Sequence, residues 1–179
     1  MFEPFYPNYY VSSAYAIDYR KLYDSGVRGV IFDVDNTLVP HDAPADNRAK
    51  RLFQEFHSMG METCLLSNNR EPRVAGFAAE VGTKYIYKGN KPFVKGYVRA
   101  MELMGTSPDT TVFVGDQLFT DIWGANRAGI VSYLTMPIDP REEIQIVLKR
   151  WPEKVVLYFY RKKRDRESLG KNRNSSDNP

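Results

Sequence analysis

Two aspartates, Asp33 and Asp35, directly follow the apolar run GVIF at residues 29–32. Because they stand at positions i and i+2, their side chains leave an extended chain on the same side, and two carboxylates would converge there. Mg²⁺ is the natural counter-ion, since it prefers hard oxygen ligands and is usually held by one or two carboxylates together with a substrate phosphate. The alternative is that the pair merely caps the end of a strand.

Apolar runs of strand length recur along the chain and alternate with stretches whose apolar residues have helical spacing. The runs lie at residues 27–34, 62–67, 84–87, 110–116 and 131–136, and the helical stretches at 46–59, 72–81, 92–103, 121–128 and 141–149. Alternating strands and helices predict a parallel sheet. We therefore expect an α/β fold, a doubly wound, Rossmann-like parallel sheet of about five strands with helices on both faces.

Ligands of such a sheet gather beyond the carboxyl ends of its strands, and polar residues follow four of the runs at that position. They are Asp33 and Asp35, Ser67 with Asn68 and Asn69, the segment Lys88–Lys91, and Asp116 with Asp121 farther on. Asp116 is the expected second metal ligand. In such an acidic site, the charges of Mg²⁺ and Lys91 are not enough to hold a phosphate, and hydrogen-bond donors are needed as well. Ser67 and the free N–H groups at the start of the next helix can supply them.

In this order the polar residues resemble the four motifs of the haloacid dehalogenase (HAD) superfamily. DVDNT, at residues 33–37, is similar to its nucleophile motif, and GDQLFTD, at 115–121, to its fourth motif. Ser67 and Lys91 stand where the second and third motifs are expected. The resemblance covers residues 30–128 and rests on the whole set, since neither Ser67 nor Lys91 alone is specific.

The resemblance implies that Asp33 attacks phosphorus to form an aspartyl phosphate, while Asp35 protonates the leaving group and then activates water. It implies that Mg²⁺ is held by Asp33, Asp116 and the backbone carbonyl of Asp35. The other implied roles are a phosphoryl contact for Ser67, charge neutralisation by Lys91, orientation of Lys91 or a metal-bound water by Asp121, and support from Thr37 and Asn68.

The resemblance also narrows the reaction and the substrate. Dehalogenases of this superfamily lack an acid at the position of Asp35 and its transport ATPases carry threonine there, so a phosphatase or phosphotransferase is implied, with hydrolysis as the default. The strings SNNREPRV, NKPF and GDQLFTDIWGANRAG are similar to the YqeG subfamily of class III A phosphatases. Its eukaryotic relatives dephosphorylate phosphatidylglycerophosphate, so the implied substrate is that lipid or a similar anionic phospholipid.

The spacing of the motifs leaves no room for a cap domain over the site. Twenty-nine residues separate Thr37 from Ser67 and 23 separate Ser67 from Lys91, each about one helix and one strand. An open site suits a phosphate carried on something large, such as a lipid headgroup. The alternative is that a neighbouring subunit of a homo-oligomer covers the site and the substrate is soluble.

The 179 residues, of which 42% are hydrophobic, suffice for one folded domain with tails. We expect an aromatic N-terminal segment over residues 1–20, a HAD-like phosphatase domain over 21–150, and an aromatic and basic extension over 151–179 whose last residues are disordered. Aromatic side chains beside Lys and Arg suit an anionic membrane surface. The alternative is that both tails pack on the domain.

No apolar run approaches the roughly 20 residues of a membrane span, and the N-terminus lacks the features of a secretory signal. We therefore expect a cytoplasmic protein, with peripheral contact at the inner face of the membrane as a hypothesis. The single cysteine, Cys64, is expected to be buried and inert. A basic tail without a basic face on the core gives no reason to expect a nucleic-acid partner.

Several other polar residues have weaker interpretations. His41 and His57 are expected at the surface, while Arg73 and Arg127 would either reach a phosphate or fix a helix to a loop. Three functions remain open: a Mg²⁺-dependent phosphatase of an anionic phospholipid, a phosphatase of a soluble nucleotide or sugar phosphate, and a catalytically silent HAD-fold binding protein.

Overall fold

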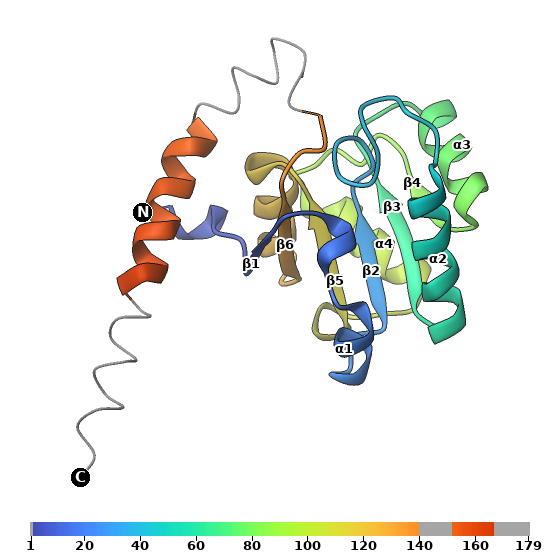
Figure 1. The fold of residues 1–179 in the computed structure, drawn as a ribbon, viewed down its shortest axis with the longest axis horizontal. Coiled ribbons are helices and arrows are strands. Elements are labelled where there is room, and N and C mark those ends of the chain that lie inside the picture. Colours follow the sequence, from blue (N-terminus) through green and yellow to red (C-terminus); the bar gives the residue numbers. More distant parts are fainter. Residues whose placement is uncertain (1, 140–151, 167–179) are drawn as a thin grey trace.

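The computed structural model describes residues 2–139 and 152–166. Six parallel strands form one sheet in the order β1-β6-β5-β2-β3-β4 (Figure 1). They are β1 Tyr9–Val11, β2 Gly29–Phe32, β3 Glu62–Leu66, β4 Lys84–Ile86, β5 Thr111–Gly115 and β6 Val131–Thr135. The predicted α/β fold and its parallel sheet are confirmed, and the five apolar runs are β2 to β6. The edge strand β1 is additional. It has only three residues, and they are half-buried or exposed, so the pattern of apolar runs did not predict this strand.

The helices are α1 Tyr19–Asp24, α2 Asn47–Met59, α3 Glu71–Val81, α4 Val94–Met104 and α5 Trp123–Arg127. The predicted start and stop signals hold for α2, because the Asp46 carboxylate accepts the Ala49 N–H at 2.8 Å and Gly60 ends the helix at φ 71°. The helix α4 begins two residues later than Pro92, and a π-helical turn, Leu118–Ile122, precedes α5. The predicted helix over 141–149 lies outside the described residues.

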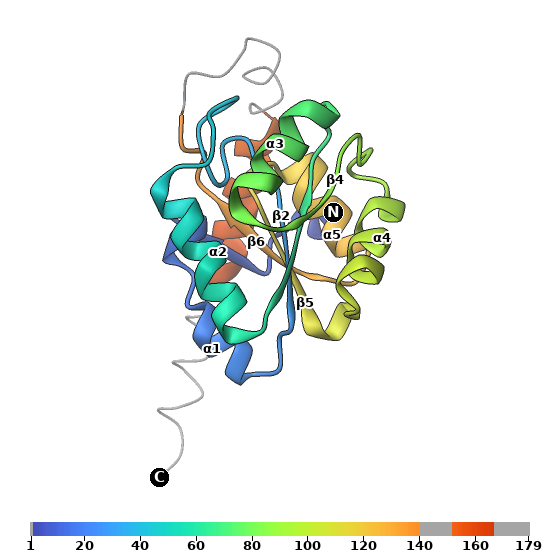
Figure 2. The same ribbon diagram turned by 90° about the vertical axis from the view of Figure 1, so that its right-hand side faces the viewer.

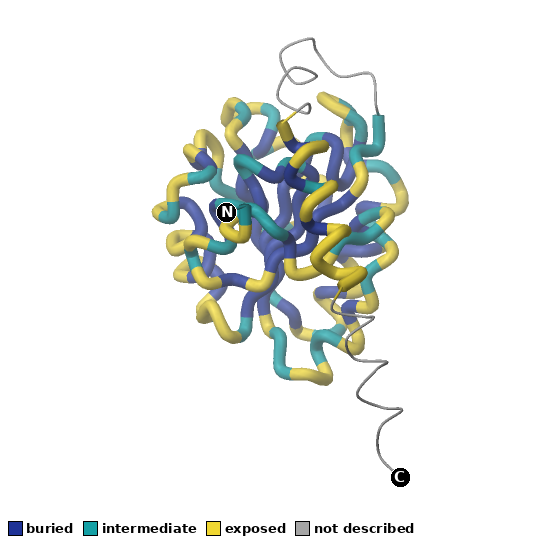
Figure 3. The backbone as a smooth tube through the Cα atoms, turned by 90° about the vertical axis from the view of Figure 1, so that its left-hand side faces the viewer, coloured by how far each residue is buried: buried dark blue, intermediate teal, exposed yellow. Residues whose placement is uncertain are grey.

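Helices cover both faces of the sheet, as a doubly wound fold requires. In β2, Val30 and Phe32 pack with α2 and α3, whereas Ile31 faces the other way, toward α4 and α5. Figure 2 views the sheet nearly edge-on, with α1 and α2 on one side and α4 and α5 on the other. The strands form the buried centre of the molecule and the outward sides of the helices are exposed (Figure 3).

The order of the strands places a topological switch point between β2 and β5. From β2 the chain goes to β3 on one side, and from β5 it goes to β6 on the other, so the loops that follow β2 and β5 diverge. Ligands of open α/β sheets bind at such a switch point. Between Thr37 and Lys91 the chain forms α2, β3, α3 and β4 and no cap domain, as the spacing predicts.

The described parts of both tails lie against the domain. Side chains from the N-terminal segment and from the helix at 152–166 pack against the π-helical turn and the end of β6. The residues of this cluster are Phe2, Phe5, Tyr6, Tyr10, Leu118, Phe119, Ile122, Leu134, Val156 and Leu157. The rings of Tyr6 and Tyr160 lie 5.5 Å apart, edge to face. Within the described ranges, no helix combines the length and the apolar character needed to span a bilayer.

Candidate active site

The strand ends bring four of the predicted site residues to one place. Asp33 directly follows β2, Ser67 follows β3 and Asp116 follows β5. The Asp33 N–H donates to the Val114 carbonyl at 2.9 Å, which continues the ladder between β2 and β5 beyond the end of β2. Lys91 arrives from the segment between β4 and α4, where Asn68 exchanges two hydrogen bonds with its backbone at 2.8 and 3.1 Å.

Lys91 lies between two buried carboxylates. Its Nζ is 2.7 Å from Asp33 Oδ1 and 2.6 Å from Asp121 Oδ1. The three side chains are 4%, 8% and 1% exposed, respectively. Burial disfavours the charged form of Lys91, but the Asp121 and Asp33 carboxylates outweigh this and raise its pKa. The ammonium group is therefore charged and fixed.

Asp33 remains in an environment that resists its negative charge. Burial raises the pKa of Asp33 to about 7, and the nearby Asp121 carboxylate adds to this effect, while Lys91 opposes it. A second positive charge beside Asp33 would therefore favour its ionised form. Among the described residues, none donates a hydrogen bond to the other oxygen of Asp33, Oδ2.

Asp121 connects Lys91 to the loop that carries Asp116. One of its oxygens accepts from Lys91, and the other accepts from the N–H groups of Asp116 and Gln117 at 3.2 and 3.0 Å. A side chain at Gly115 would place its Cβ 2.6 Å from Asp121 Oδ2, so this approach requires glycine. Both oxygens of Asp121 thus have partners, and its contact with Lys91 is compatible with the predicted role of orienting that side chain.

A divalent cation fits the donor set. Asp33, Asp116 and Asp121 each offer an oxygen, and these atoms lie within 4.8 Å of one another. The Thr37 hydroxyl donates to Asp116 Oδ1 at 3.3 Å, which supports that ligand. Three buried carboxylates against one ammonium leave a net charge of −2, which one divalent ion would neutralise. Hard oxygen donors of this kind suit Mg²⁺.

Asp35 has a different environment from that of Asp33. Its Oδ1 accepts from Arg73 Nη2 at 2.8 Å and from the Asp42 N–H at 3.0 Å, and its Oδ2 accepts from Asn69 Nδ2 at 3.1 Å. Burial alone would raise the pKa of Asp35, but the hydrogen bonds from Arg73 and Asn69 outweigh it and lower the pKa. Asp35 is held here as a carboxylate.

Sequence reasoning did not assign these two partners of Asp35. Arg73 was left between a phosphate contact and a structural contact, and Asn69 had no role of its own. The signal lies in the string SNNREPRV, because α3 begins at Glu71 directly beyond β3, so its first turn must border the site. Such a position brings a long cationic side chain within reach of the carboxylate that follows β2.

Ser67 is placed to donate to a ligand. Its hydroxyl oxygen accepts the Asn69 N–H at 3.1 Å, and the residue is buried directly after β3. Within the described residues its own proton has no acceptor, so it can be donated to a phosphoryl oxygen.

The remaining candidates lie outside the cluster. His41 and His57 are exposed, and burial raises the pKa of the Cys64 thiol to about 12, so Cys64 is inert as expected. Arg127 lies over the Trp123 ring, 5.3 Å from its centroid, and is not part of the cluster.

A doubly wound sheet with an acid cluster and a buried lysine beyond its carboxyl ends defines a class of metal-dependent enzymes that act on phosphate groups. A family model of haloacid dehalogenase-like hydrolases matches residues 41–129. The chain is 35% identical over 160 residues to "Probable phosphatase YqeG" of Bacillus subtilis (strain 168), a match that covers 89% of this chain and 93% of that protein. The chain therefore belongs to the HAD superfamily of hydrolases and is a HAD-type phosphatase.

Two further comparisons extend this result. The chain is 30% identical over 176 residues to phosphatidylglycerophosphate phosphatase 1, chloroplastic/mitochondrial, of Arabidopsis thaliana, with 83% of this chain and 48% of that protein covered. The chain thus spans about half of that relative. A HAD subfamily III A hydrolase of Legionella pneumophila has the same fold, with a TM-score of 0.51, 15% identity, and coverage of 66% of this chain and 70% of that one.

Proposed function

We propose that this chain is a Mg²⁺-dependent phosphomonoesterase that acts through an aspartyl phosphate on Asp33, and that its substrate is phosphatidylglycerophosphate or a similar anionic phospholipid. The observation that carries the chemistry is the buried contact of Lys91 with Asp33 at 2.7 Å and Asp121 at 2.6 Å. It fixes one oxygen of Asp33 and leaves the other free of hydrogen bonds from the described residues. A nucleophilic carboxylate needs that arrangement, with one oxygen held in place and the other open to attack phosphorus.

The reaction has two steps. In the first, an oxygen of Asp33 attacks phosphorus and the bond between phosphorus and the ester oxygen breaks; Asp35, after taking up a proton from solvent, gives that proton to the departing alkoxide. In the second, water attacks the phosphorus of the aspartyl phosphate and gives a proton to Asp35, and inorganic phosphate leaves Asp33. Ser67 and Lys91 donate to phosphoryl oxygens in both steps. When bound, Mg²⁺ would neutralise the carboxylates and polarise the phosphoryl group.

The lipid substrate is supported by the open site and by what surrounds it. Between Thr37 and Lys91 the chain forms no cap domain, and large apolar side chains are exposed in the segments that follow β4 and β6. Phe93, two residues after Lys91, is 65% exposed, and Met136, directly after β6, is 50% exposed. Apolar side chains beside a phosphate site suit a substrate whose phosphate lies at a bilayer surface, where the protein would act peripherally.

The test is phosphate release by the purified full chain from a substrate panel. The panel contains phosphatidylglycerophosphate in detergent micelles, nucleotide and sugar monophosphates in water, and an aryl phosphate, each with Mg²⁺ and with a chelator. We expect Mg²⁺-dependent release from the lipid at a kcat/KM at least about tenfold above the soluble metabolites, a difference of 1.4 kcal/mol. Faster turnover of a nucleotide or sugar phosphate would support the soluble alternative.

The variant Asp33→Asn is the control for the mechanism. We expect it to lose turnover of every substrate, because it removes the nucleophile, while its thermal unfolding shows a folded protein. Unchanged turnover would refute the aspartyl phosphate. A wild-type chain without turnover of any panel member would favour the binding protein instead.

A further inference from the structure

The helix at residues 152–166 has one face seated on the domain. Val156 and Tyr160, four residues apart, are 3% and 6% exposed, and Val156 packs within the aromatic cluster of the N-terminal segment. The buried Glu153 carboxylate accepts the Leu118 N–H at 3.0 Å. Leu118 stands two residues after Asp116, so the first turn of this helix adjoins the loop that carries the acid cluster. The helix is therefore fixed beside the wall of the site.

The opposite face of this helix exposes large apolar side chains. Val155, Tyr158 and Phe159 are 37%, 61% and 42% exposed. Tyr158 contacts the Phe159 ring at 5.5 Å, and Phe159 also contacts the Phe2 ring at 5.6 Å. Figure 1 shows the helix on the outside of the molecule, beside the β1 and β6 edge of the sheet. These side chains are thus exposed on a helix whose opposite face packs on the domain.

The charged residues of the helix are mostly basic. The exposed cations are Lys154, Arg161, Lys162, Lys163, Arg164 and Arg166. The acids are Asp165, which is exposed, and Glu153, which is turned into the protein. Lys163 pairs with Glu3 at 2.6 Å. The exposed surface of the helix thus carries a clear excess of positive charge.

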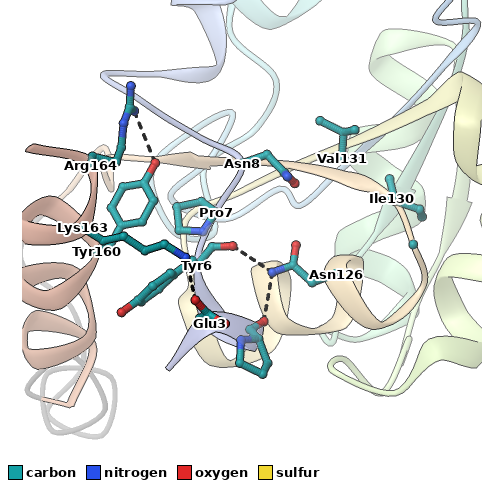
Figure 4. Close-up of a pocket in the computed structure, with 12 residues that line it drawn as sticks. Glu3, Tyr6, Pro7, Asn8, Asn126, Ile130, Val131, Tyr160, Lys163 and Arg164 are labelled. Carbon is teal, nitrogen blue, oxygen red and sulfur yellow. Dashed lines mark hydrogen bonds and ion pairs between the residues drawn. The ribbon is translucent and has the colours of Figure 1, made fainter. Parts of the chain in front are cut away.

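A hollow of about 400 Å³ lies where the aromatic and the basic side chains meet. Its lining is Tyr6, Phe159, Lys162, Lys163 and Arg166, with three cations and no acid. A second hollow of about 730 Å³ includes Lys163 and Arg164 in its lining, and Figure 4 shows these residues with Tyr160 on the helix, facing Glu3 and Tyr6 of the N-terminal segment. The smaller hollow has the polarity that a phosphate headgroup requires.

We propose that the outer face of the helix at 152–166 is a docking surface for an anionic lipid bilayer. Tyr158 and Phe159 would enter the interface, and Lys162 and Arg166 would hold headgroup phosphates. The inference rests on the proposed action on a phospholipid and names the surface that brings the protein to it. The phosphates of a nucleic acid could also pair with the basic side chains. A nucleic acid would not, however, explain why aromatic and aliphatic side chains are exposed beside them on the same face of the helix.

The test is co-sedimentation of the full chain with phosphatidylcholine vesicles, with and without phosphatidylglycerol, at low and high salt. We expect binding that requires phosphatidylglycerol and weakens with salt. The double variant Lys162→Glu and Arg166→Glu should bind at least about twenty-fivefold more weakly, since each basic residue contributes about fivefold near such a surface. Its matched control is Lys95→Glu with Arg99→Glu, an exposed pair with the same spacing on α4.

The apolar contribution is tested by Tyr158→Ser, with Leu103→Ser, 44% exposed on α4, as its control. We expect weaker vesicle binding in Tyr158→Ser alone, and unchanged turnover of a soluble aryl phosphate in all four variants. Salt-insensitive binding, equal binding to phosphatidylcholine alone, or wild-type binding by the Lys162 and Arg166 variant would overturn the proposal. A Tyr158 variant that binds vesicles like the wild type while an RNA oligomer displaces both proteins would favour a nucleic acid.

The docking surface and the proposed substrate can fail separately. If the protein binds the anionic vesicles as expected but does not release phosphate from phosphatidylglycerophosphate in micelles, the docking surface stands and the substrate is wrong. If it hydrolyses the micellar lipid but does not bind vesicles, the substrate stands and the docking surface is wrong.

Discussion

Replacing Lys91 with methionine would remove the ammonium group that separates two buried carboxylates. Its Nζ lies 2.7 Å from Asp33 and 2.6 Å from Asp121, and none of the three side chains is more than 8% exposed. Methionine has a similar shape and no charge, so the two carboxylates would remain buried beside Asp116 with no cation. Breaking a buried ion pair by removal of one partner costs about 3–5 kcal/mol. We expect the free energy of unfolding of the metal-free protein to fall by about that amount.

The assay is urea unfolding in the presence of a chelator, with Lys84→Met as the control. Lys84 also pairs with a carboxylate, that of Glu62, but both side chains are more than 40% exposed, so its loss should cost less than about 1 kcal/mol. The double variant Lys91→Met with Asp121→Asn should recover more than half of the loss, because it removes one of the uncompensated charges. Equal losses for Lys91→Met and Lys84→Met would refute the electrostatic account.

Three further predictions follow from the same contacts. Asp33→Asn should abolish Mg²⁺-dependent turnover of an aryl phosphate and leave the protein folded, as thermal unfolding would show. Burial raises the pKa of Asp33 to about 7, so between about pH 4 and pH 7 the metal-free folded protein keeps a proton that the unfolded chain has lost. The free energy of unfolding should therefore fall as the pH rises from about 4 to about 7. The same Asn variant should flatten that slope, and an unchanged slope would contradict the assignment. Arg73→Gln removes the hydrogen bonds that lower the pKa of Asp35, and should cost about 1–3 kcal/mol in urea unfolding at neutral pH. The cost should shrink below about pH 4, where the unfolded carboxyl is protonated, and an equal cost at both pH values would contradict it.

The sequence was sufficient for the fold because its signals are local. The periodicity of apolar residues marks the strands and the helices. Gly60 and Gly82 mark the ends of α2 and α3, because each takes the left-handed conformation that glycine adopts without strain. The strand β1 was not predicted, since its pairing with β6 depends on contacts between residues about 124 apart, such as Asn8 with Ser132. Pairing of this kind leaves no pattern in a three-residue segment.

The placement of the candidate residues at the strand ends could be predicted from the sequence, but their hydrogen-bond partners could not. Asp33, Ser67, Lys91 and Asp116 follow strand ends, and any parallel sheet brings such positions to one edge. Which carboxylate Lys91 contacts depends on the π-helical turn Leu118–Ile122, a rare backbone conformation that has no sequence signature. The structure was therefore needed to show that both oxygens of Asp121 are engaged and that one of them contacts Lys91.

The two aspartates that follow β2 have different environments in the structure. Asp33 enters the cluster of net negative charge, where burial raises its pKa, whereas Asp35 faces α3, where Arg73 and Asn69 lower its pKa. Opposite shifts in neighbouring carboxyls divide their roles, because the nucleophile needs a nearby cation to stay ionised, whereas a general base must be deprotonated so that it can accept a proton. As it stands, Asp35 is prepared to activate water. Its earlier task, protonation of the leaving group, requires the contact with Arg73 to break first. Replacement of Arg73 should therefore change the turnover of substrates with poor leaving groups more than that of substrates with good ones.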